Sequence, residues 1–320
     1  MQKILIIKHG SLGDIILSMC SIFSVKNHFK NSKITILTEK KYYELFKNVP
    51  VIDNVKFDNR PKFFYFMSYL KLCIWFYKEK FDWVFDFQTS NRTNIYYFIF
   101  SLFSDFKWSG IARKCSHPHV NPLRKKMHTL ERQKDQLEVA GITSKANFDW
   151  SFFKSDISKF KLNNNLFLLV IGGSVHRPQK RWSIKNYVSL IKYLNEKKIC
   201  PLIIGGESET KYIDKKLFSG LKFKNLVGKT TYFDLAEIAR KSKWIVGNDT
   251  GPMHLLVQCS KSNTRKIVLF GSHSNPKLCA PRGKNVFIIQ KNQINNITLK
   301  DILEFLDKKK IELFSDFSYK

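Results

Sequence analysis

The sequence predicts an α/β protein with two Rossmann-like domains, each built on a doubly wound parallel sheet. Short, almost continuously apolar runs end in glycine or a polar turn, which is typical of strands buried on both faces of a parallel sheet. Amphipathic helical patterns lie between these runs, for example at residues 183–197 and 231–242. Strand and helix therefore alternate along the chain, as they do in doubly wound folds. The clearest apolar runs are residues 3–10, 166–173, 200–206, 243–249 and 265–271.

The alternating pattern restarts in the middle of the chain. The length of 320 residues suits two domains of ordinary size. Residues 151–165 show no clear periodicity and end in three asparagines, so we interpret them as a linker. The sequence therefore predicts a first domain at residues 1–155, a second at 165–300, and a last amphipathic helix that begins near residue 297.

The chain is strongly basic, with 55 Lys and Arg against 26 Asp and Glu and a formal net charge of +29. Such an excess favours a polyanionic partner: a nucleic acid, an anionic membrane surface or a phosphorylated substrate. A compositional explanation also stands, because the chain is rich in Lys, Asn, Ile and Phe, whose codons are AT-rich. The charge therefore suggests partners without choosing among them.

The sequence shows no pattern for export or membrane spanning. The apolar run before Lys8 is only four residues long (4–7), so no signal peptide is expected. The most apolar uncharged run, residues 93–104, is well short of the roughly 20 residues that cross a bilayer. The six cysteines have no metal-like spacing and are expected to be reduced thiols. We expect a cytoplasmic protein that is soluble or peripheral to a membrane.

Two aromatic stretches, residues 63–77 and 95–103, lie in the first half. Helices that face the core are the favoured interpretation. The alternative is that one of them leaves an apolar strip exposed to a membrane interface, with Trp, Tyr and Lys at its edges.

The first candidate site follows the first predicted strand, where residues 9–14 (HGSLGD) lead into an apolar helix. This is not the GxGxxG fingerprint of dinucleotide-binding domains, but the carboxyl end of a strand is where open α/β sheets bind ligands. Asp14 could simply cap the helix. Because Gly10 and Gly13 allow a ligand to approach it closely, a catalytic role is the sharper hypothesis.

The second candidate site is residues 247–255 (GNDTGPMHL), which also join a strand to a helix. Pro252 suits a first helical residue, and Asp249 or Thr250 would cap the helix. Free backbone N–H groups at such a helix start attract a diphosphate. A turn without a ligand is the alternative, but Asp, Thr, Gly and His are denser here than a turn requires.

The third candidate site is the glycine-rich segment 172–182 (GGSVHRPQKRW) at another strand end. Its backbone N–H groups and cationic side chains could hold a phosphate, although the spacing is not that of a Walker loop. The next strand ends at Gly205-Gly206, and Glu207 and Glu209 could offer carboxylates to ribose hydroxyls or a base.

Four segments, residues 3–18, 86–94, 172–191 and 228–255, together resemble glycosyltransferase family 9, the ADP-heptose:lipopolysaccharide heptosyltransferases. The resemblance implies a GT-B fold, in which two Rossmann-like domains face a cleft and the C-terminal helix (297–320) crosses back to the first domain. It also implies that the first domain binds the acceptor and the second the nucleotide sugar.

The resemblance implies a role for each candidate residue. Asp14 would be the general base of an inverting transfer. Lys180 would face the diphosphate, and the helix start at Thr250 and Gly251 would stabilise the leaving ADP. The remaining nucleotide-sugar residues would be Ser174, His176, Glu207, Glu209, Asp249 and His254. No DxD motif occurs, so no metal and no cofactor are expected.

The chain departs from the family pattern at a few positions. Thr89 stands where the family usually has glycine, and Ser183 where it usually has proline. Ser174 to His176 replace a threonine pair. These differences affect the donor sugar more than the nucleotide.

The acceptor side is expected to use Ser11 and Gly13 together with basic residues of the first half. A phosphorylated, lipid-linked acceptor needs such a surface, although ordinary solvated charge is the simpler interpretation of each residue. The histidines at 117, 119 and 128 have no ligand partner at metal spacing, so no metal is expected there. The basic residues are Arg92, Arg113, Lys114 and Arg124, with Lys125 and Lys126 beside Arg124.

The leading hypothesis is an inverting, metal-independent transfer of heptose, or a related sugar, from an ADP-sugar to lipopolysaccharide core. The enzyme would work at the inner face of the inner membrane. Transfer of another nucleotide sugar to a different surface glycan is one alternative, and a non-catalytic sugar-nucleotide sensor is another. A basic nucleic-acid-binding protein is the alternative of a different class. It has only the charge in its favour, because no RRM, helix-turn-helix or zinc motif occurs, and no nucleic-acid partner is expected.

Overall fold

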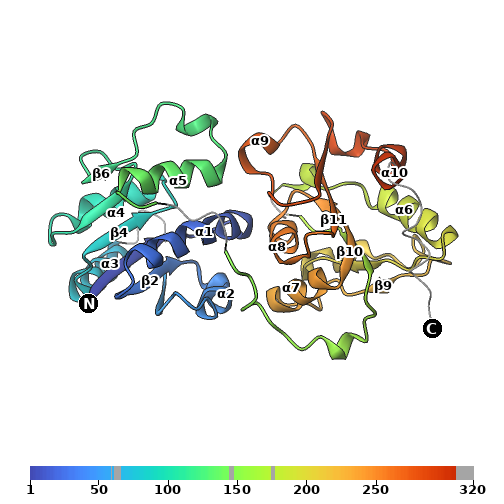
Figure 1. The fold of residues 1–320 in the computed structure, drawn as a ribbon, viewed down its shortest axis with the longest axis horizontal. Helices are drawn as coiled ribbons and strands as arrows, with labels where there is room; N and C mark the ends of the chain where they lie inside the picture. Colours follow the sequence, from blue (N-terminus) through green and yellow to red (C-terminus); the bar gives the residue numbers. More distant parts are fainter. Residues whose placement is uncertain (59, 61–65, 144–147, 174–176, 308–320) are drawn as a thin grey trace. The chain divides into compact units, whose positions relative to one another are not determined.

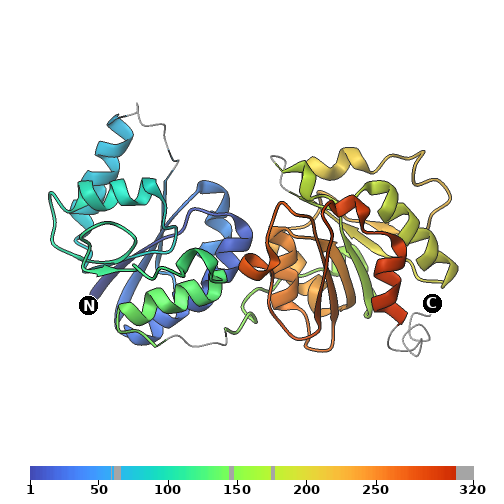
Figure 2. The ribbon, with the colours of Figure 1, turned by 90° about the horizontal axis from the view of Figure 1, so that it is seen from above.

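The computed structural model describes residues 1–58, 60, 66–143, 148–173 and 177–307, and the chain divides into two compact units, Met1–Phe152 and Phe153–Lys320. Each unit contains a six-stranded sheet in its described part, and all strand pairs are parallel (Figure 1). Helices cover both faces of each sheet (Figures 1 and 2). The predicted fold class, two doubly wound parallel sheets, is confirmed.

The first sheet has the strand order β3-β2-β1-β4-β5-β6. The chain leaves β1 toward β2 and β3 on one side and continues through β4 on the other, so the topological switch point lies between β1 and β4. Ligands bind at such points in open α/β sheets. The strands are β1 (Gln2–Ile7), β2 (Ser32–Thr38), β3 (Asn54–Phe57), β4 (Trp83–Asp86), β5 (Lys107–Gly110) and β6 (His117–Pro118).

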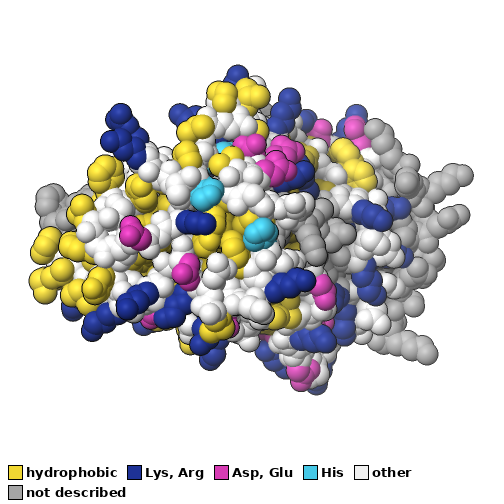
Figure 3. All heavy atoms as spheres, turned by 60° about the vertical axis from the view of Figure 1, so that its left-hand side comes forward, with side chains coloured by type: hydrophobic (Ala, Val, Ile, Leu, Met, Phe, Trp, Pro, Cys, Tyr) yellow, Lys and Arg dark blue, Asp and Glu magenta, His cyan; other side chains and the backbone are white. Residues whose placement is uncertain are grey.

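Two pairs of helices sandwich this sheet, α1 with α5 on one face and α3 with α4 on the other (Figure 2). Side chains alternate along β1, so Leu5 and Ile7 pack with Phe76 and Phe100 of the α3–α4 layer. Hydrophobic side chains also remain at the surface of this unit (Figure 3). The helices are α1 (Leu12–His28), α2 (Tyr43–Lys47), α3 (Phe66–Glu79), α4 (Asn91–Phe100) and α5 (Thr129–Val139).

The second sheet has the order β12-β11-β10-β7-β8-β9, so its switch point lies between β10 and β7. Its strands are β7 (Leu166–Val170), β8 (Leu202–Ile204), β9 (Lys224–Asn225), β10 (Ser242–Asn248), β11 (Arg265–Phe270) and β12 (Val286–Gln290). Its helices are α6 (Ile184–Glu196), α7 (Tyr232–Arg240), α8 (Gly251–Cys259), α9 (Pro276–Cys279) and α10 (Leu299–Asp307).

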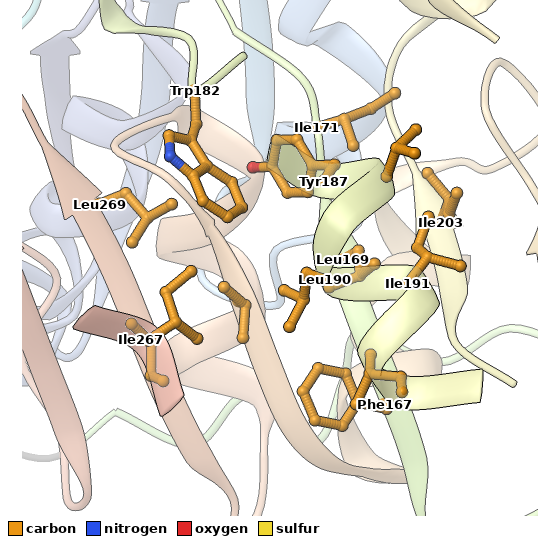
Figure 4. Packing of buried hydrophobic residues seen from close by; sticks show 14 of the residues in the cluster. Phe167, Leu169, Ile171, Trp182, Tyr187, Leu190, Ile191, Ile203, Ile267 and Leu269 are labelled. Atoms are coloured by element: carbon orange, nitrogen blue, oxygen red, sulfur yellow. The ribbon is translucent and has the colours of Figure 1, made fainter. Parts of the chain in front are cut away.

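One hydrophobic core of the second unit lies between its sheet and helices α6 and α10. Leu190 and Ile191 of α6 meet Leu169 of β7 and Ile267 of β11 in this core (Figure 4). The aromatic ring of Trp182, just before α6, packs edge-on against Tyr187 with 4.8 Å between the ring centroids. The loop that carries the glycine-rich motif is therefore anchored in the core at its far end.

The segment interpreted as a linker packs on the second unit instead of standing free. Phe153 is fully buried and stacks on Phe233 of α7, and Ser155 donates a 2.6 Å hydrogen bond to Asp234. The buried hydrophobic residues of this segment are not regularly spaced, which is why the sequence pattern predicted no helix or strand here.

The described part of the C-terminal helix is α10, and its Ile302 and Leu306 are buried in the core of the second unit. Residues 308–320 lie outside the described residues, so the expected crossing to the first domain stays a prediction. No helix in the described part of the chain has the length and apolar character of a membrane span.

Candidate functional site

The switch point of the first sheet brings together the motifs at residues 9–14 and 86–94. The backbone N–H of His9 donates a 3.1 Å hydrogen bond to Oε1 of Gln88, and Nζ of Lys8 donates to the carbonyl of Phe87 at 3.2 Å. Residues 79 apart in the sequence are thus neighbours because β1 and β4 are adjacent. The two segments form one side of a site at the carboxyl edge of the sheet.

Thr89, which stands where the family usually has glycine, lies in a turn. Its φ angle is +45°, the left-handed region that glycine enters freely and a β-branched residue enters only at a cost. The buried carboxylate of Asp86 holds this turn, because its Oδ1 accepts hydrogen bonds from the N–H groups of Gln88 and Thr89. The turn survives the loss of glycine because these hydrogen bonds hold it.

Asp14 lies in the first turn of α1 and is partly exposed. Its Oδ2 accepts hydrogen bonds from the backbone N–H and the hydroxyl of Ser11, both at 3.0 Å, so it also serves as the N3 residue of a helix capping box. Among the described residues, no hydrogen bond is found at Oδ1. That oxygen can accept a proton from a bound hydroxyl.

Two cations act on Asp14 from neighbouring elements. Lys8, at the end of β1, is almost completely buried, and this burial lowers its pKa from the usual lysine range, against the attraction of Asp14. Burial likewise lowers the pKa of Arg132, on α5, and Asp14 again opposes the shift. Lys8 and Arg132 were not predicted from the sequence, because only the packing of α5 on α1 brings Arg132 toward Asp14.

An open pocket of ≈ 500 Å³ lies at the same edge of the sheet and is lined by Glu39, Lys40, Lys41, Asp58, Arg60 and Arg92. Arg92 was predicted from the sequence, and its guanidinium donates a 2.7 Å hydrogen bond to the hydroxyl of Tyr69. The other cations were missed, because they follow different strands and form no motif in the sequence. Cations outnumber carboxylates here, so the pocket suits an anionic ligand.

Asp58 forms the buried base of this pocket. Nε2 of His9 lies 2.7 Å from its Oδ2, and the hydroxyl of Tyr96 donates to the same oxygen at 2.6 Å. Burial alone would raise the pKa of Asp58, but the hydrogen bonds and charge of His9 and the Tyr96 hydroxyl hold it below its usual range. Asp58 is thus a charged anchor that joins β1, β3 and α4.

The other basic residues predicted for the acceptor side do not line this pocket. Arg113 and Lys114 are exposed in the loop after β5. Nε of Arg124 donates to Nδ1 of His119 at 3.2 Å, and Nε2 of His119 lies 2.6 Å from Asp135. Arg124 interacts electrostatically with Arg132 and Asp86, so it lies toward the Asp14 site, whereas Arg113 and Lys114 do not line the pocket that holds Arg92. The acceptor role of these three residues stays a prediction.

In the second unit, the motif at 247–255 forms the start of α8. Thr250 is the N-cap, Gly251 begins the helix, and Pro252 lies in its first turn. Thr250 Oγ1 and His254 Nδ1 are buried and have no hydrogen-bond partner in the described part of the chain. Buried polar atoms without partners are costly, so a pair of them at a helix start indicates a ligand.

Lys180 lies beside this helix start. Its Nζ is 2.8 Å from Oδ2 of Asp249, which also accepts a 2.9 Å hydrogen bond from the hydroxyl of Ser274. Nε2 of His254 lies 3.7 Å from the other oxygen of Asp249. Burial alone would raise the pKa of Asp249, but the nearby His254, the hydrogen bond and charge of Lys180 and the hydroxyl of Ser274 hold it below its usual range. The structure thus brings Lys180, Asp249 and His254 together.

Asn248, which was not among the predicted site residues, joins the loops around this site. Its Oδ1 accepts from the N–H of Trp182 at 3.0 Å and from the hydroxyl of Tyr187 at 3.2 Å. Its Nδ2 donates to the carbonyls of Ile171 and Gly172. A lone asparagine at the end of an apolar strand is the sequence signal that could have revealed it.

The two glutamates after β8 differ in position. Glu209 is buried, accepts a 2.8 Å hydrogen bond from the N–H of Gly206, and lies 3.5 Å from Arg181. Arg181 in turn donates to the carbonyl of Gly173 at 3.0 Å, so this pair supports the glycine-rich loop. Glu207 is exposed. The predicted residues Ser174 and His176 lie outside the described residues.

Comparison with known proteins decides the family. The model of glycosyltransferase family 9 (heptosyltransferase) matches residues 102–307, more than half of the chain. The chain belongs to glycosyltransferase family 9. It is therefore a glycosyltransferase, and the predicted membership of this family is confirmed. A comparison with curated protein sequences found no match to this glycosyltransferase.

Solved structures agree with this glycosyltransferase in fold. The family 9 glycosyl transferase of Veillonella parvula DSM 2008 matches with a TM-score of 0.76 at 16% identity, over 98% of this chain and 97% of that chain. E. coli heptosyltransferase WaaC, solved with ADP-2-deoxy-2-fluoro heptose, matches with a TM-score of 0.75 at 16% identity, over 97% of this chain and 100% of that chain. E. coli ADP-heptose LPS heptosyltransferase II matches with a TM-score of 0.71 at 16% identity, over 98% of this chain and 99% of that chain. The GT-B class of the glycosyltransferase is thereby established.

No group of three or more His, Cys, Asp or Glu side chains that could hold a metal occurs among the residues that the structure describes. His119 pairs with Asp135, and Nδ1 of His128 accepts a hydrogen bond from the N–H of Leu130 at the start of α5. Within this part of the glycosyltransferase, the histidines at 119 and 128 have structural partners.

Proposed function

We propose that this glycosyltransferase moves a heptose, or a related sugar, from an ADP-sugar to the lipopolysaccharide core, with inversion and without a metal. The observation that carries the proposal is the start of α8, where Thr250 Oγ1 and His254 Nδ1 are buried without partners beside the Lys180 ammonium. Helix N–H groups and a cation suit a diphosphate. Two similar E. coli heptosyltransferases, one solved with ADP-2-deoxy-2-fluoro heptose and one named for ADP-heptose, support an ADP-sugar as the donor.

In this proposal, the acceptor binds to the first unit and the donor to the second. Asp14 takes the proton from an acceptor hydroxyl as that oxygen attacks the anomeric carbon of the donor. The bond from the anomeric carbon to the diphosphate oxygen breaks on the opposite side, and its electron pair leaves with ADP. The N–H groups of α8 and the charge of Lys180 stabilise the departing diphosphate, which is the role that a metal has in other transferases.

The acceptor in this proposal is a phosphorylated lipid-linked glycan. The pocket lined by Lys40, Lys41, Arg60 and Arg92 supports an anionic acceptor, because four cations there face two carboxylates. We include the cytoplasmic face of the inner membrane as the place of work. The net charge of +29 favours approach to an anionic leaflet.

The donor site is tested by replacing Thr250 with valine, which has nearly the same shape and no hydroxyl. The Oγ1 of Thr250 makes no capping hydrogen bond in the described structure, so Thr250→Val is expected to leave the free energy of unfolding of the free protein unchanged or raised. ADP affinity, measured by isothermal titration calorimetry, should fall by about tenfold. UDP and GDP should bind more weakly than ADP to the wild type.

The matched control is Thr231→Val at the N-cap of α7. The Oγ1 of Thr231 does accept a hydrogen bond from the N–H of Asp234, at 3.1 Å, so this variant should lose about 1 kcal/mol of stability and keep its ADP affinity. Equal ADP affinity in wild type and Thr250→Val would overturn the donor site. Tight, salt-sensitive binding of a nucleic acid duplex without nucleotide preference would overturn the enzymatic proposal as a whole.

A further inference from the structure

Helix α3 presents a row of hydrophobic side chains to solvent. Phe66, Met67, Leu70, Ile74 and Tyr77 are all exposed, and Phe66 is the most exposed of them at 71%. At 100° per residue these five side chains project within about a third of the helix circumference. The opposite side of α3 carries the residues that fill the core, such as Leu72 and Phe76. The helix is therefore apolar both toward the sheet and away from it.

The C-terminal end of α4 continues this exposed apolar surface. Phe98, Leu102 and Phe103 are between 61% and 71% exposed. Phe76 of α3 stacks on Phe100 of α4 with 3.9 Å between ring centroids, which ties the two elements together. Figure 3 shows hydrophobic side chains gathered on this part of the first unit. We call the exposed residues of α3 and of the α4 end the α3–α4 surface.

Cations border the α3–α4 surface. Lys71 and Lys78 are exposed and project next to the apolar row of α3, by the same helical geometry. The loop with Arg113 and Lys114 lies beside α4, because the hydroxyl of Tyr97 donates a 2.8 Å hydrogen bond to the carbonyl of Lys114. Glu79, the one acidic residue of α3, projects away from the apolar row, and its carboxylate lies 3.8 Å from Lys3.

We propose that the α3–α4 surface docks on an anionic lipid bilayer, with α3 lying in the plane of the interface. An apolar face bordered by lysines is the pattern of helices that lie in a membrane surface. Each nearby Lys or Arg adds attraction to anionic headgroups. A second copy of the chain fits less well, because a symmetric interface would bring the bordering cations of two copies together.

Overall charge does not locate this surface. Lys and Arg outnumber Asp and Glu in both units, and the excess is larger in the second. An even spread of charge is what compositional bias produces. The combination of exposed apolar side chains with bordering lysines on α3 is therefore what carries the inference, and it does not depend on which sugar is transferred.

The test is flotation of the full chain with vesicles of phosphatidylcholine alone or of phosphatidylcholine with phosphatidylglycerol. The wild type should bind the anionic vesicles. The double variant Leu70→Glu/Ile74→Glu should bind them at least about tenfold more weakly, since both side chains would leave the bilayer. Val139→Glu, at a position exposed to a similar degree on α5, is the control and should bind like the wild type.

A second variant keeps the test independent of the apolar substitutions. Lys71→Gln/Lys78→Gln should weaken binding to anionic vesicles by about fivefold for each charge removed and leave binding to neutral vesicles unchanged. Equal vesicle binding by wild type and both double variants would overturn the proposal. So would a wild-type dimer, detected by analytical ultracentrifugation, that Leu70→Glu/Ile74→Glu converts to monomer.

Calorimetric titration with ADP separates this inference from the proposed function. All these variants should bind ADP like the wild type, because the α3–α4 surface is in the first unit and Lys180 and Thr250 are in the second. Loss of vesicle binding with intact ADP binding supports the docking surface. Vesicle binding that follows the expected pattern in a protein without ADP affinity supports the surface and contradicts only the proposed function.

Discussion

The Nζ atom of Lys180 lies 2.8 Å from the Oδ2 atom of Asp249, at the start of α8. The two side chains are only 13% and 6% exposed, so the ion pair is mostly shielded from water. Ser274 donates to the same oxygen, which leaves Lys180 held in place beside the helix N-terminus. Lys180, which the sequence predicts to bind the diphosphate, is thus already positioned by Asp249 of the motif at 247–255.

Lys180→Ala should therefore weaken ADP binding by about 10- to 100-fold, because a hydrogen bond to a charged group is worth about 1.5–3 kcal/mol. Lys185→Ala removes an exposed lysine five residues later and should leave ADP affinity unchanged. Isothermal titration calorimetry with both variants measures the difference. If both variants bind ADP like the wild type, Lys180 does not contact the diphosphate.

Asp14→Asn should reduce sugar transfer by about 100- to 10,000-fold, since asparagine cannot take a proton. ADP affinity should not change.

The Asp14→Asn substitution also weakens the capping box of α1, so a control with the same structural role is needed. Asp234→Asn is that control, because Asp234 is the N3 residue of the capping box of α7. Both variants should lose about 1 kcal/mol of stability or more. Retained turnover in Asp14→Asn would exclude Asp14 as the base.

Asn248→Ala should lower the free energy of unfolding by about 2–3 kcal/mol, because it leaves several buried polar groups without partners. It should also weaken ADP binding, since Asn248 links the loop before α6 to the loop before α8. Tyr187→Phe removes one of these partners together with the 2.8 Å hydrogen bond from the hydroxyl to the carbonyl of Val170, and should cost about 1–2 kcal/mol with normal ADP affinity. Urea denaturation and calorimetry check both values. A destabilised Asn248→Ala protein with wild-type ADP affinity would show that the residue supports the core alone.

Asp58 should make the first unit sensitive to acid. The pKa of Asp58 is held below its usual value of 3.8 in the folded protein, so its contribution to stability is present above that value. The contribution is lost as the pH falls through the folded pKa. The difference in unfolding free energy between wild type and Asp58→Asn should therefore shrink when urea denaturation is repeated from about pH 7 down to about pH 3. A difference that stays constant over this range would contradict a charged role for Asp58.

Local chemistry explains what could be predicted from the sequence. Continuous apolar runs, helical periodicity and turn residues depend on near neighbours in the chain, so the two doubly wound sheets and the helix start at Thr250 and Gly251 were predictable. For the aromatic stretch that forms α3, the sequence allowed two interpretations, a core-facing helix or an apolar strip at a membrane interface. Its aromatic residues are dense enough to suit both a core and an interface, and only packing against the sheet shows which side each residue takes.

Contacts between distant residues required the tertiary structure. His9 and Gln88 are neighbours because β1 and β4 are adjacent, and Lys40, Arg60 and Arg92 line one pocket because the carboxyl ends of β2, β3 and β4 lie at one edge. The order of strands in a sheet leaves no trace in local periodicity. Sequence patterns therefore determined the fold class and the motifs that carry the chemistry, whereas strand order decided which of their side chains meet, because that depends on pairings formed across tens of residues.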